Sequence, residues 1–351
     1  MRKAFDKMVR NVGHWLAQEG PEGDVVISSR SRYARNISGF RFVPSAAKDE
    51  LEAVVEMAET AAKKVLHSAI VADPSELSET DRNMLMERNI LTRDILKATH
   101  PTRVLFVSDE SASVLINEED HIRLQVVEPG LQPQRTLERL NALDDKLEEH
   151  LEFAFSERWG YLTACPTNVG TGLRASVMLH LPALVLTRQI IRVVEAVKSV
   201  GLALRGFHGE GSFLYQSDFF QVSNQKTLGR SEEAIVENIS TILPQVIEYE
   251  RMLREQLMGQ ARRKIEDRVW RAWGILNSSR LISTGEALEM LSLVRLGAAM
   301  GLLNGLSVKK VNPLFVLTQP AHIQKRLKGE ASEEERDATR ADLLRNWFAK
   351  N

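Results

Sequence analysis

The spacing of the hydrophobic residues changes near Asn224, and this change constrains the fold more than any other sequence feature. Upstream of it, short β-rich runs alternate with stretches of helical periodicity. The strand-like runs lie at 24–27, 103–107, 112–116 and 122–127, and the helical stretches at 46–66 and 136–153. Neighbouring strands with flanking helices, without regular βαβ repetition, predict an α+β fold with a largely antiparallel sheet.

Downstream of Asn224 the pattern is mostly helical as far as Asn351. Ser231 is a suitable N-cap for a helix with a continuous apolar stripe, and Pro244 is expected to kink that helix. We therefore predict two domains: a mixed domain over 1–250 and a mostly α-helical C-terminal domain over 251–351. A long helix can cross the boundary between them.

Composition excludes several classes of protein. Hydrophobic residues make up 43% of the 351 residues, which suffices for a large core, and the formal net charge of −1 argues against direct nucleic-acid binding. The single cysteine, Cys165, excludes an internal disulfide and zinc sites built from several cysteines. No apolar run is long enough for a membrane span.

The N-terminal residues have no continuous apolar core of a signal peptide, so we expect a cytoplasmic protein. Between Phe5 and Leu16, apolar residues recur at helical spacing instead. This spacing predicts one amphipathic helix that packs against the rest of the chain.

Common nucleotide-binding motifs are absent. The sequence contains neither a P-loop nor the H-R-D and D-F-G motifs of ordinary protein kinases. It contains arginines instead. Arg30 and Arg32 follow an apolar strand and should project from the same face, where two guanidinium groups would suit a polyphosphate. Taken alone, this pair has the simpler interpretation of two surface arginines.

Two groups of carboxylates are further candidates. Glu118, Glu119 and Asp120 interrupt two apolar strands and so should lie at a turn, while Glu210 stands between two glycines that allow close approach of a ligand. A solvated acidic turn is the simpler interpretation of the first group. Cys165, taken alone, is more often a small buried residue than a nucleophile.

Four segments, in the same order along the chain, carry a resemblance to the phosphagen (guanidino) kinases, the superfamily of creatine and arginine kinases. The segment CPTNVGTGLRAS at 165–176 is very similar to the signature loop of that superfamily, and NEEDH at 117–121 resembles its N-E-E-D segment. Two more of its blocks match SSRSR at 28–32 and RGFHGE at 205–210. The resemblance implies a phosphagen-kinase-like catalytic domain over 1–250.

Within the superfamily, the chain most resembles the bacterial protein-arginine kinases. The first motif begins at residue 28, which leaves no room for the helical domain that precedes it in the small-molecule kinases. Met178 stands where creatine and arginine kinases typically carry histidine. The helical C-terminal extension ends in RDATRA at 336–341, which resembles the phosphoarginine-binding motif of the protein-arginine kinases.

The resemblance implies ATP as phosphoryl donor and an arginine side chain of a protein as acceptor. Glu119 and Glu210 would hold the guanidinium and accept its proton, Glu119 being the better candidate for the base, and Cys165 would tune the electrostatics. Mg²⁺ would bridge phosphate oxygens, with no protein ligand assigned. The implied nucleotide-binding residues are Ser28, Ser29, Arg30, Ser31, Arg32, Arg123, Arg174, Ala175, Ser176, Val177, Met178, Arg205, Gly206, Phe207, His208, Gly209 and Glu210. Asn89 replaces a histidine that usually contacts the nucleotide.

The C-terminal motif suggests a regulatory site. Ser332 and Glu335 have capping-box spacing, so a helix should begin there and place Arg336 and Arg340 one turn apart, with Asp337 beside them. Spacing alone fits a solvated charged helix. The resemblance implies instead that Arg336, Asp337, Arg340 and Ala341 form a phosphoarginine-binding site.

The resemblance also implies partners. These are unfolded proteins and a heat-shock repressor as substrates, a zinc-containing activator protein, a Clp-type unfoldase–protease that degrades marked proteins under stress, and a second copy of the chain in a homodimer. Two alternatives stay open: a small-molecule guanidino kinase, and a catalytically inactive phosphoarginine-binding adaptor.

Overall fold

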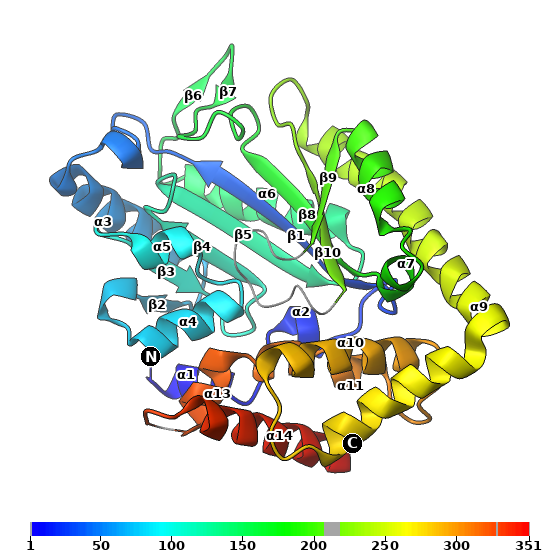
Figure 1. Cartoon of the computed structure of the whole chain (residues 1–351). Helices are drawn as coiled ribbons and strands as arrows, with labels where there is room; N and C mark the ends of the chain where they lie inside the picture. Colours follow the sequence, from blue (N-terminus) through cyan, green and yellow to red (C-terminus); the bar gives the residue numbers. More distant parts are fainter. Residues whose placement is uncertain (1, 207–217, 328, 351) are drawn as a thin grey trace.

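The computed structural model describes residues 2–206, 218–327 and 329–350. Within them, an antiparallel sheet has the strand order β2-β3-β4-β5-β1-β8-β10-β9 (Figure 1). Its strands are β1 (Val26–Arg35), β2 (Ile70–Ala72), β3 (Arg103–Phe106), β4 (Ala112–Ile116), β5 (Ile122–Pro129), β8 (Leu173–His180), β9 (Leu202–Gly206) and β10 (Phe219–Asn224). A separate hairpin consists of β6 (Phe155–Ser156) and β7 (Gly160–Tyr161). The predicted strands and the antiparallel arrangement are confirmed.

Helices cover one face of this sheet and bury the larger core. They are α3 (Lys48–Val65), α6 (Pro133–Glu148), α8 (Ile190–Ser199) and the first half of α9 (Glu232–Ser278). The predicted helix over 46–66 is confirmed as α3, whereas the one over 136–153 ends earlier, because Phe153 leaves α6 to form a β-bridge with Ile37. Short helices α4 (Glu79–Glu87), α5 (Arg93–Lys97) and α7 (Pro182–Leu186) connect the strands.

The expectation of one N-terminal amphipathic helix is wrong. The segment forms two short helices, α1 (Arg2–Met8) and α2 (His14–Ala17), with Gly13 at the break. The backbone amide of His14 donates a hydrogen bond to Asp109 O at 2.8 Å. A Cβ at Gly13 would lie 2.4 Å from a carboxylate oxygen of Glu110, so close packing of the two chain segments requires glycine here.

Helix α9 begins as predicted, with Ser231 Oγ accepting a hydrogen bond from the amide of Ala234. Its backbone angles leave the helical region at Ala261 (φ −138°, ψ 25°) rather than at Pro244. Leu243 and Val246, on either side of the proline, are buried in the larger core, and this packing keeps the helix continuous there. The predicted domain boundary at 250 therefore falls inside one helix, and the division into two domains stays a prediction.

The C-terminal helices gather at one end of the sheet (Figure 1). They are α10 (Thr284–Ala299), α11 (Val308–Val311), α12 (Leu314–Leu317), α13 (Pro320–Leu327) and α14 (Glu333–Lys350). Their core also contains residues of the sheet and of α2, among them Trp15, Ile27 and Phe219. The C-terminal helices thus share a core with the strands that carry the candidate site.

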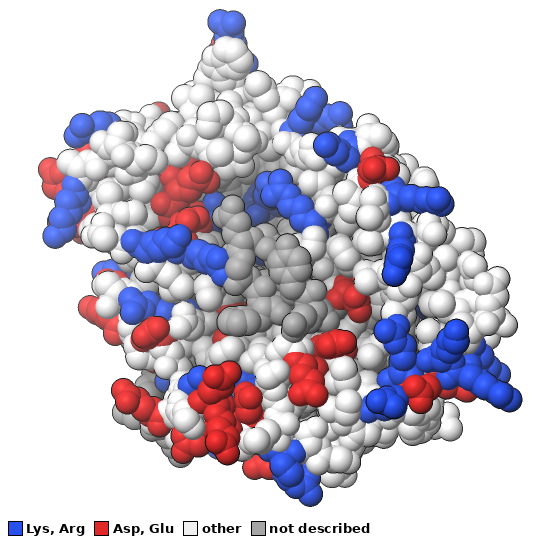
Figure 2. All heavy atoms as spheres, viewed as in Figure 1, with Lys and Arg blue, Asp and Glu red and all other residues white. Residues whose placement is uncertain are grey.

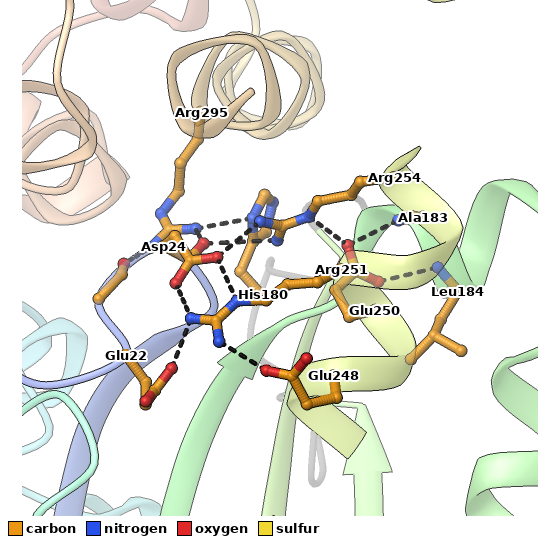
Figure 3. A network of polar contacts seen from close by, with 11 residues as sticks. Glu22, Asp24, His180, Ala183, Leu184, Glu248, Glu250, Arg251, Arg254 and Arg295 are labelled. Carbon is orange, nitrogen blue, oxygen red and sulfur yellow. Dashed lines mark hydrogen bonds and ion pairs between the residues drawn. The ribbon is translucent and has the colours of Figure 1, made fainter. Parts of the chain in front are cut away.

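A partly buried ionic network links the residues just before β1 to α9 and α10 (Figure 3). Asp24 accepts hydrogen bonds from Arg251 and Arg254, and the Arg295 guanidinium donates to Asp24 O and to Nδ1 of His180, both at 2.9 Å. Burial opposes ionisation of Asp24, but the hydrogen bond from Arg251 and the charges of Arg251 and Arg254 hold its pKa below the usual value.

In the part of the chain that the structure describes, no helix combines the length and the apolar character needed to cross a membrane.

Candidate active site

Five arginines converge on one cavity of about 480 Å³ on the face of the sheet opposite α6, which we call the arginine cavity. The sheet brings them together: Arg30 and Arg32 alternate along β1, Arg174 on β8 is the ladder partner of Arg32, and Arg205 pairs with Gln221. The described residues that line the cavity include Arg30, Arg32, Arg123, Arg174, Arg205, Gly206, Asp94, Glu119, Cys165, Thr167, Asn168, Gln221 and Ser223. Acidic and basic side chains meet around the centre of this face (Figure 2).

The charges in this cavity are poorly balanced. Burial, together with the charges of Arg174 and Arg123, lowers the pKa of Arg30 to about 10. Burial and the positive charges of neighbouring arginines also lower the pKa values of Arg32 and Arg174. Nε of Arg32 is buried and has no hydrogen-bond partner among the described residues. Clustered, incompletely paired guanidinium groups of this kind suit a polyanion with several oxygens.

Glu119 projects into the same cavity from the turn between β4 and β5, where the sequence predicts a turn. Its carboxylate lies 3.6 Å from Nη2 of Arg123, while the neighbouring Glu118 is buried and accepts a hydrogen bond from Nη1 of Arg123. Burial and the charge of Asp120 raise the pKa of Glu119. A raised pKa means that the Glu119 carboxylate binds a proton more strongly. A general base that accepts a proton from a guanidinium needs this property.

Cys165 reaches the cavity from the loop before β8. Its Sγ lies 3.0 Å from Oγ1 of Thr167, and the side chain is half-buried. The Asp120 carboxylate fixes this loop to the acidic turn, since it accepts hydrogen bonds from the amide of Ala164 at 2.6 Å and from Nδ2 of Asn36 at 2.7 Å. Hydrogen bonds of Asp120 therefore link the turn that carries Glu119 to the loop that carries Cys165.

Some predicted nucleotide-binding side chains point elsewhere. Ser29 and Ser31 face α6, where Ser29 Oγ donates to Gly130 O and Ser31 Oγ bonds the hydroxyl of Thr136, each at 2.8 Å. Ala175 and Val177 are buried in the larger core. Ser28 and Ser176 line a small recess beside Arg30. The remaining predicted residues Phe207, His208, Gly209 and Glu210 lie outside the described residues.

A second, mostly apolar cavity of about 310 Å³ adjoins the first. We call it the nucleoside cavity after the ligand that the resemblance to phosphagen kinases implies beside the phosphates. The two cavities share Arg30, Arg32, Arg123 and Gln221. Met178 and Asn89 both line the nucleoside cavity, and binding of a nucleotide by Met178 stays a prediction. Sequence reasoning missed other lining residues, including Trp15, Gln125, Phe219, Phe315 and Gln319, because nothing in their local sequence signals a ligand.

The C-terminal motif begins α14 as predicted: Ser332 Oγ accepts a hydrogen bond from the amide of Glu335, whose carboxylate accepts one from the amide of Ser332. Arg336 and Asp337 are partly exposed. Arg340, in contrast, is buried, and its guanidinium donates to Thr318 O and Ile282 O, both at 2.8 Å, and to the Asp337 carboxylate at 2.5 Å. These bonds use Nε and Nη1 of Arg340, and direct contact of Arg340 with a phosphate stays a prediction. Ala341 lies in the C-terminal core.

No group of three or more His, Cys, Asp or Glu side chains within residues 2–206, 218–327 and 329–350 is arranged to hold a metal ion. Among the described residues that line the arginine cavity, besides the cationic groups, two carry carboxylates, Asp94 and Glu119. A divalent cation would therefore fit here as a companion of phosphate oxygens rather than as an ion held by the protein alone.

Comparison with known proteins places these features in a family. Residues 50–253 match the family model described as the ATP:guanido phosphotransferase C-terminal catalytic domain, and residues 262–351 match that of the protein-arginine kinase McsB C-terminal domain. Over 347 residues the chain is 44% identical to the protein-arginine kinase of Geobacillus sp. (strain WCH70), covering 97% of this chain and 96% of the relative. It is 45% identical over 344 residues to that of Halothermothrix orenii, covering 97% of each.

Solved structures share the fold. A duplicated taurocyamine kinase from Schistosoma mansoni, with bound transition state analog components, matches 74% of this chain with a TM-score of 0.62 and 26% identity. This chain covers 39% of the length of that duplicated protein. The match to a lombricine kinase covers 73% of this chain and 78% of the lombricine kinase chain, with a TM-score of 0.59 and 24% identity. The full-length matches show that the chain belongs to the protein-arginine kinase family of ATP:guanido phosphotransferases.

Proposed function

We propose that this kinase transfers the γ-phosphoryl group of ATP to arginine side chains of proteins, giving phosphoarginine. The observation that carries the proposal is the arginine cavity, which five arginines line together with Glu119. The arginines form a site for a triphosphate, and the carboxylate lies where an incoming guanidinium would be held.

The reacting guanidinium must lose a proton as its nitrogen attacks phosphorus, because its pKa exceeds about 12 and its charge is delocalised. Glu119 holds the guanidinium by charge-assisted hydrogen bonds and accepts that proton. Negative charge moves from the transferred phosphoryl group toward ADP during the reaction. The phosphate oxygens that carry this charge are neutralised by five arginines: Arg30, Arg32, Arg123, Arg174 and Arg205. Bound to those oxygens, Mg²⁺ would add further charge neutralisation.

Two further residues have proposed positions in this chemistry. Cys165, on the loop fixed to the acidic turn, lies beside the guanidinium and tunes its electrostatics without forming a covalent bond to phosphorus. Glu210, which lies outside the described residues, is proposed as the second carboxylate that clamps the guanidinium.

The partly exposed pair Arg336 and Asp337 is proposed as a regulatory site for phosphoarginine, with Arg336 facing the phosphoryl group and Asp337 the guanidino group. Arg340 then acts as a positioning residue, since it holds the Asp337 carboxylate at 2.5 Å. Binding there would act allosterically on the kinase, a coupling of typically about 1–3 kcal/mol. The coupling has a physical route, because Arg340 also bonds Thr318 O, next to Gln319 in the nucleoside cavity.

The wider setting is proposed from the family. We propose a cytoplasmic homodimer that acts in stress response on unfolded proteins and a heat-shock repressor, with a zinc-containing activator, and that marks proteins for a Clp-type unfoldase–protease.

The test uses Glu119→Gln, which keeps the size of the side chain and removes its charge. Removal of a general base typically costs about 10²- to 10⁴-fold in rate. We expect a loss in this range for phosphorylation of an unfolded protein, with ATP affinity nearly unchanged, because the arginines hold the phosphates. Near-normal turnover would exclude Glu119 as the base.

The acceptor is tested with wild-type enzyme. An unfolded protein and free arginine are compared as acceptors of labelled phosphate from ATP, and we expect transfer to the protein. Transfer to free arginine alone would indicate a small-molecule guanidino kinase. Phosphoarginine binding without any ATP turnover would indicate an inactive adaptor.

A further inference from the structure

The C-terminal helices form one wall of the nucleoside cavity. Phe315 and Val316 of α12, and Gln319 just before α13, line it together with Phe219 of the sheet. Phe315 packs edge-on against Phe219, with ring centroids 4.7 Å apart, so the wall is joined directly to the strand that borders both cavities. The residues matched by the catalytic-domain model end at 253, so this wall lies outside that domain.

The position of the triphosphate decides what this wall contacts. Arg30, Arg32 and Arg123 line both cavities, so a triphosphate held by them leaves the nucleoside to extend into the nucleoside cavity. Together with Phe219 of the sheet, the C-terminal wall is apolar and aromatic except for the amide of Gln319. Asn89, Gln125 and Gln221 line other parts of the cavity. Apolar and aromatic surface combined with a few placed polar groups is the usual environment of a nucleobase.

The orientation of that amide follows from chemistry. Gln319 is buried, and its side chain lies 2.8 Å from Phe315 O. A carbonyl oxygen can only accept, so Nε2 must face it and Oε1 must point the other way. No described residue donates a hydrogen bond to Oε1, although the side chain lines the cavity. Gln319 therefore presents a fixed acceptor to whatever occupies the cavity.

We propose that Gln319 is a specificity-determining residue for the nucleobase: its Oε1 accepts a hydrogen bond from the exocyclic amino group of adenine. Guanine presents a carbonyl oxygen at the equivalent position and would place two acceptors against each other, which disfavours it. The proposal rests on the proposed function, because it takes ATP as the donor. It also gives the C-terminal region a direct part in nucleotide selection.

The experiment compares two donors, ATP and purine riboside triphosphate, which lacks only the amino group. Protein phosphorylation is measured for wild type, for Gln319→Met, and for the matched control Gln256→Met on the exposed side of α9. A hydrogen bond between neutral groups typically corresponds to a difference of about 2- to 13-fold. We expect wild type and control to prefer ATP by this factor in kcat/KM. For Gln319→Met we expect kcat/KM with ATP to fall to the value with purine riboside triphosphate, so that the preference is lost.

The outcomes separate the two proposals. If wild type transfers no phosphate from ATP to protein arginine, the proposed function fails. If wild type is active but Gln319→Met prefers ATP as wild type does, the assignment of Gln319 is wrong. A variant that merely loosens the wall would lower kcat/KM for both donors equally and keep their ratio, which also contradicts the proposal.

Discussion

Replacing Arg30 by methionine should stabilise the ligand-free protein and abolish its stabilisation by nucleotide. Burial and the charges of Arg174 and Arg123 lower the pKa of Arg30 well below its usual value, to about 10. One pKa unit corresponds to about 1.36 kcal/mol, so keeping this group charged in the folded state costs up to about 3 kcal/mol. Methionine retains a similar apolar stem and removes the charge.

The sign follows from linkage. The pKa of Arg30 in the folded protein lies below its value in the unfolded chain, so the charged form destabilises the fold at every pH below about 10, neutral pH included. A polyphosphate offsets the repulsion in wild type. The arginine cavity thus lowers the free energy of unfolding of the ligand-free protein and in return binds an anion, as functional sites commonly do.

The assay is urea unfolding at pH 7.5 in low salt without phosphate, with and without a non-hydrolysable ATP analogue. We expect a higher midpoint for Arg30→Met than for wild type without nucleotide, and a nucleotide-induced shift in wild type that the variant lacks. The control Arg262→Met removes an exposed arginine of α9, paired with Glu266, and should change stability by no more than about 0.5 kcal/mol. A ligand-free Arg30→Met protein that is less stable than wild type, with an undiminished nucleotide effect, would refute the reasoning.

Three further predictions concern single side chains. Arg174→Lys keeps the charge but loses the planar fork, so nucleotide should bind about 10- to 100-fold more weakly; an unchanged ATP titration would place Arg174 outside the site. Cys165→Ser replaces the thiol by a hydroxyl that can still pair with Thr167, so it should lose less activity than Glu119→Gln. Trapping a phosphocysteine during turnover would show a covalent step. Burial raises the pKa of Asp218 from 3.8 to about 6, so its ionised form destabilises the fold increasingly as pH rises through that range. Asp218→Asn should therefore be more stable than wild type at pH 8, by up to about 3 kcal/mol, with the difference vanishing below pH 4; the unfolding midpoint measured against pH checks both limits.

Local sequence predicted much of the framework. Period-two alternation placed Arg30 and Arg32 on one face of β1, and capping chemistry located the beginnings of α9 and α14 at Ser231 and Ser332. These features depend on neighbouring residues alone, so a single sequence contains the information.

Tertiary packing decided the rest. A motif match assigns a whole block such as 28–32 to the nucleotide, whereas strand alternation turns Ser29 and Ser31 toward α6. Helical spacing puts Arg336 and Arg340 one turn apart but does not indicate that Arg340 faces the core. Gln319 reaches the nucleoside cavity through the docking of α12 on the sheet, a contact between segments far apart in the chain.

The most direct test of the central claim is mass spectrometry of an unfolded protein after incubation with the kinase and Mg-ATP, kept at neutral or basic pH because a P–N bond is acid-labile. The proposed function predicts phosphoryl groups on arginine side chains, absent from reactions without ATP and strongly reduced with Glu119→Gln. Phosphoryl groups confined to serine, threonine or tyrosine, or none on the protein while ATP is consumed, would contradict it.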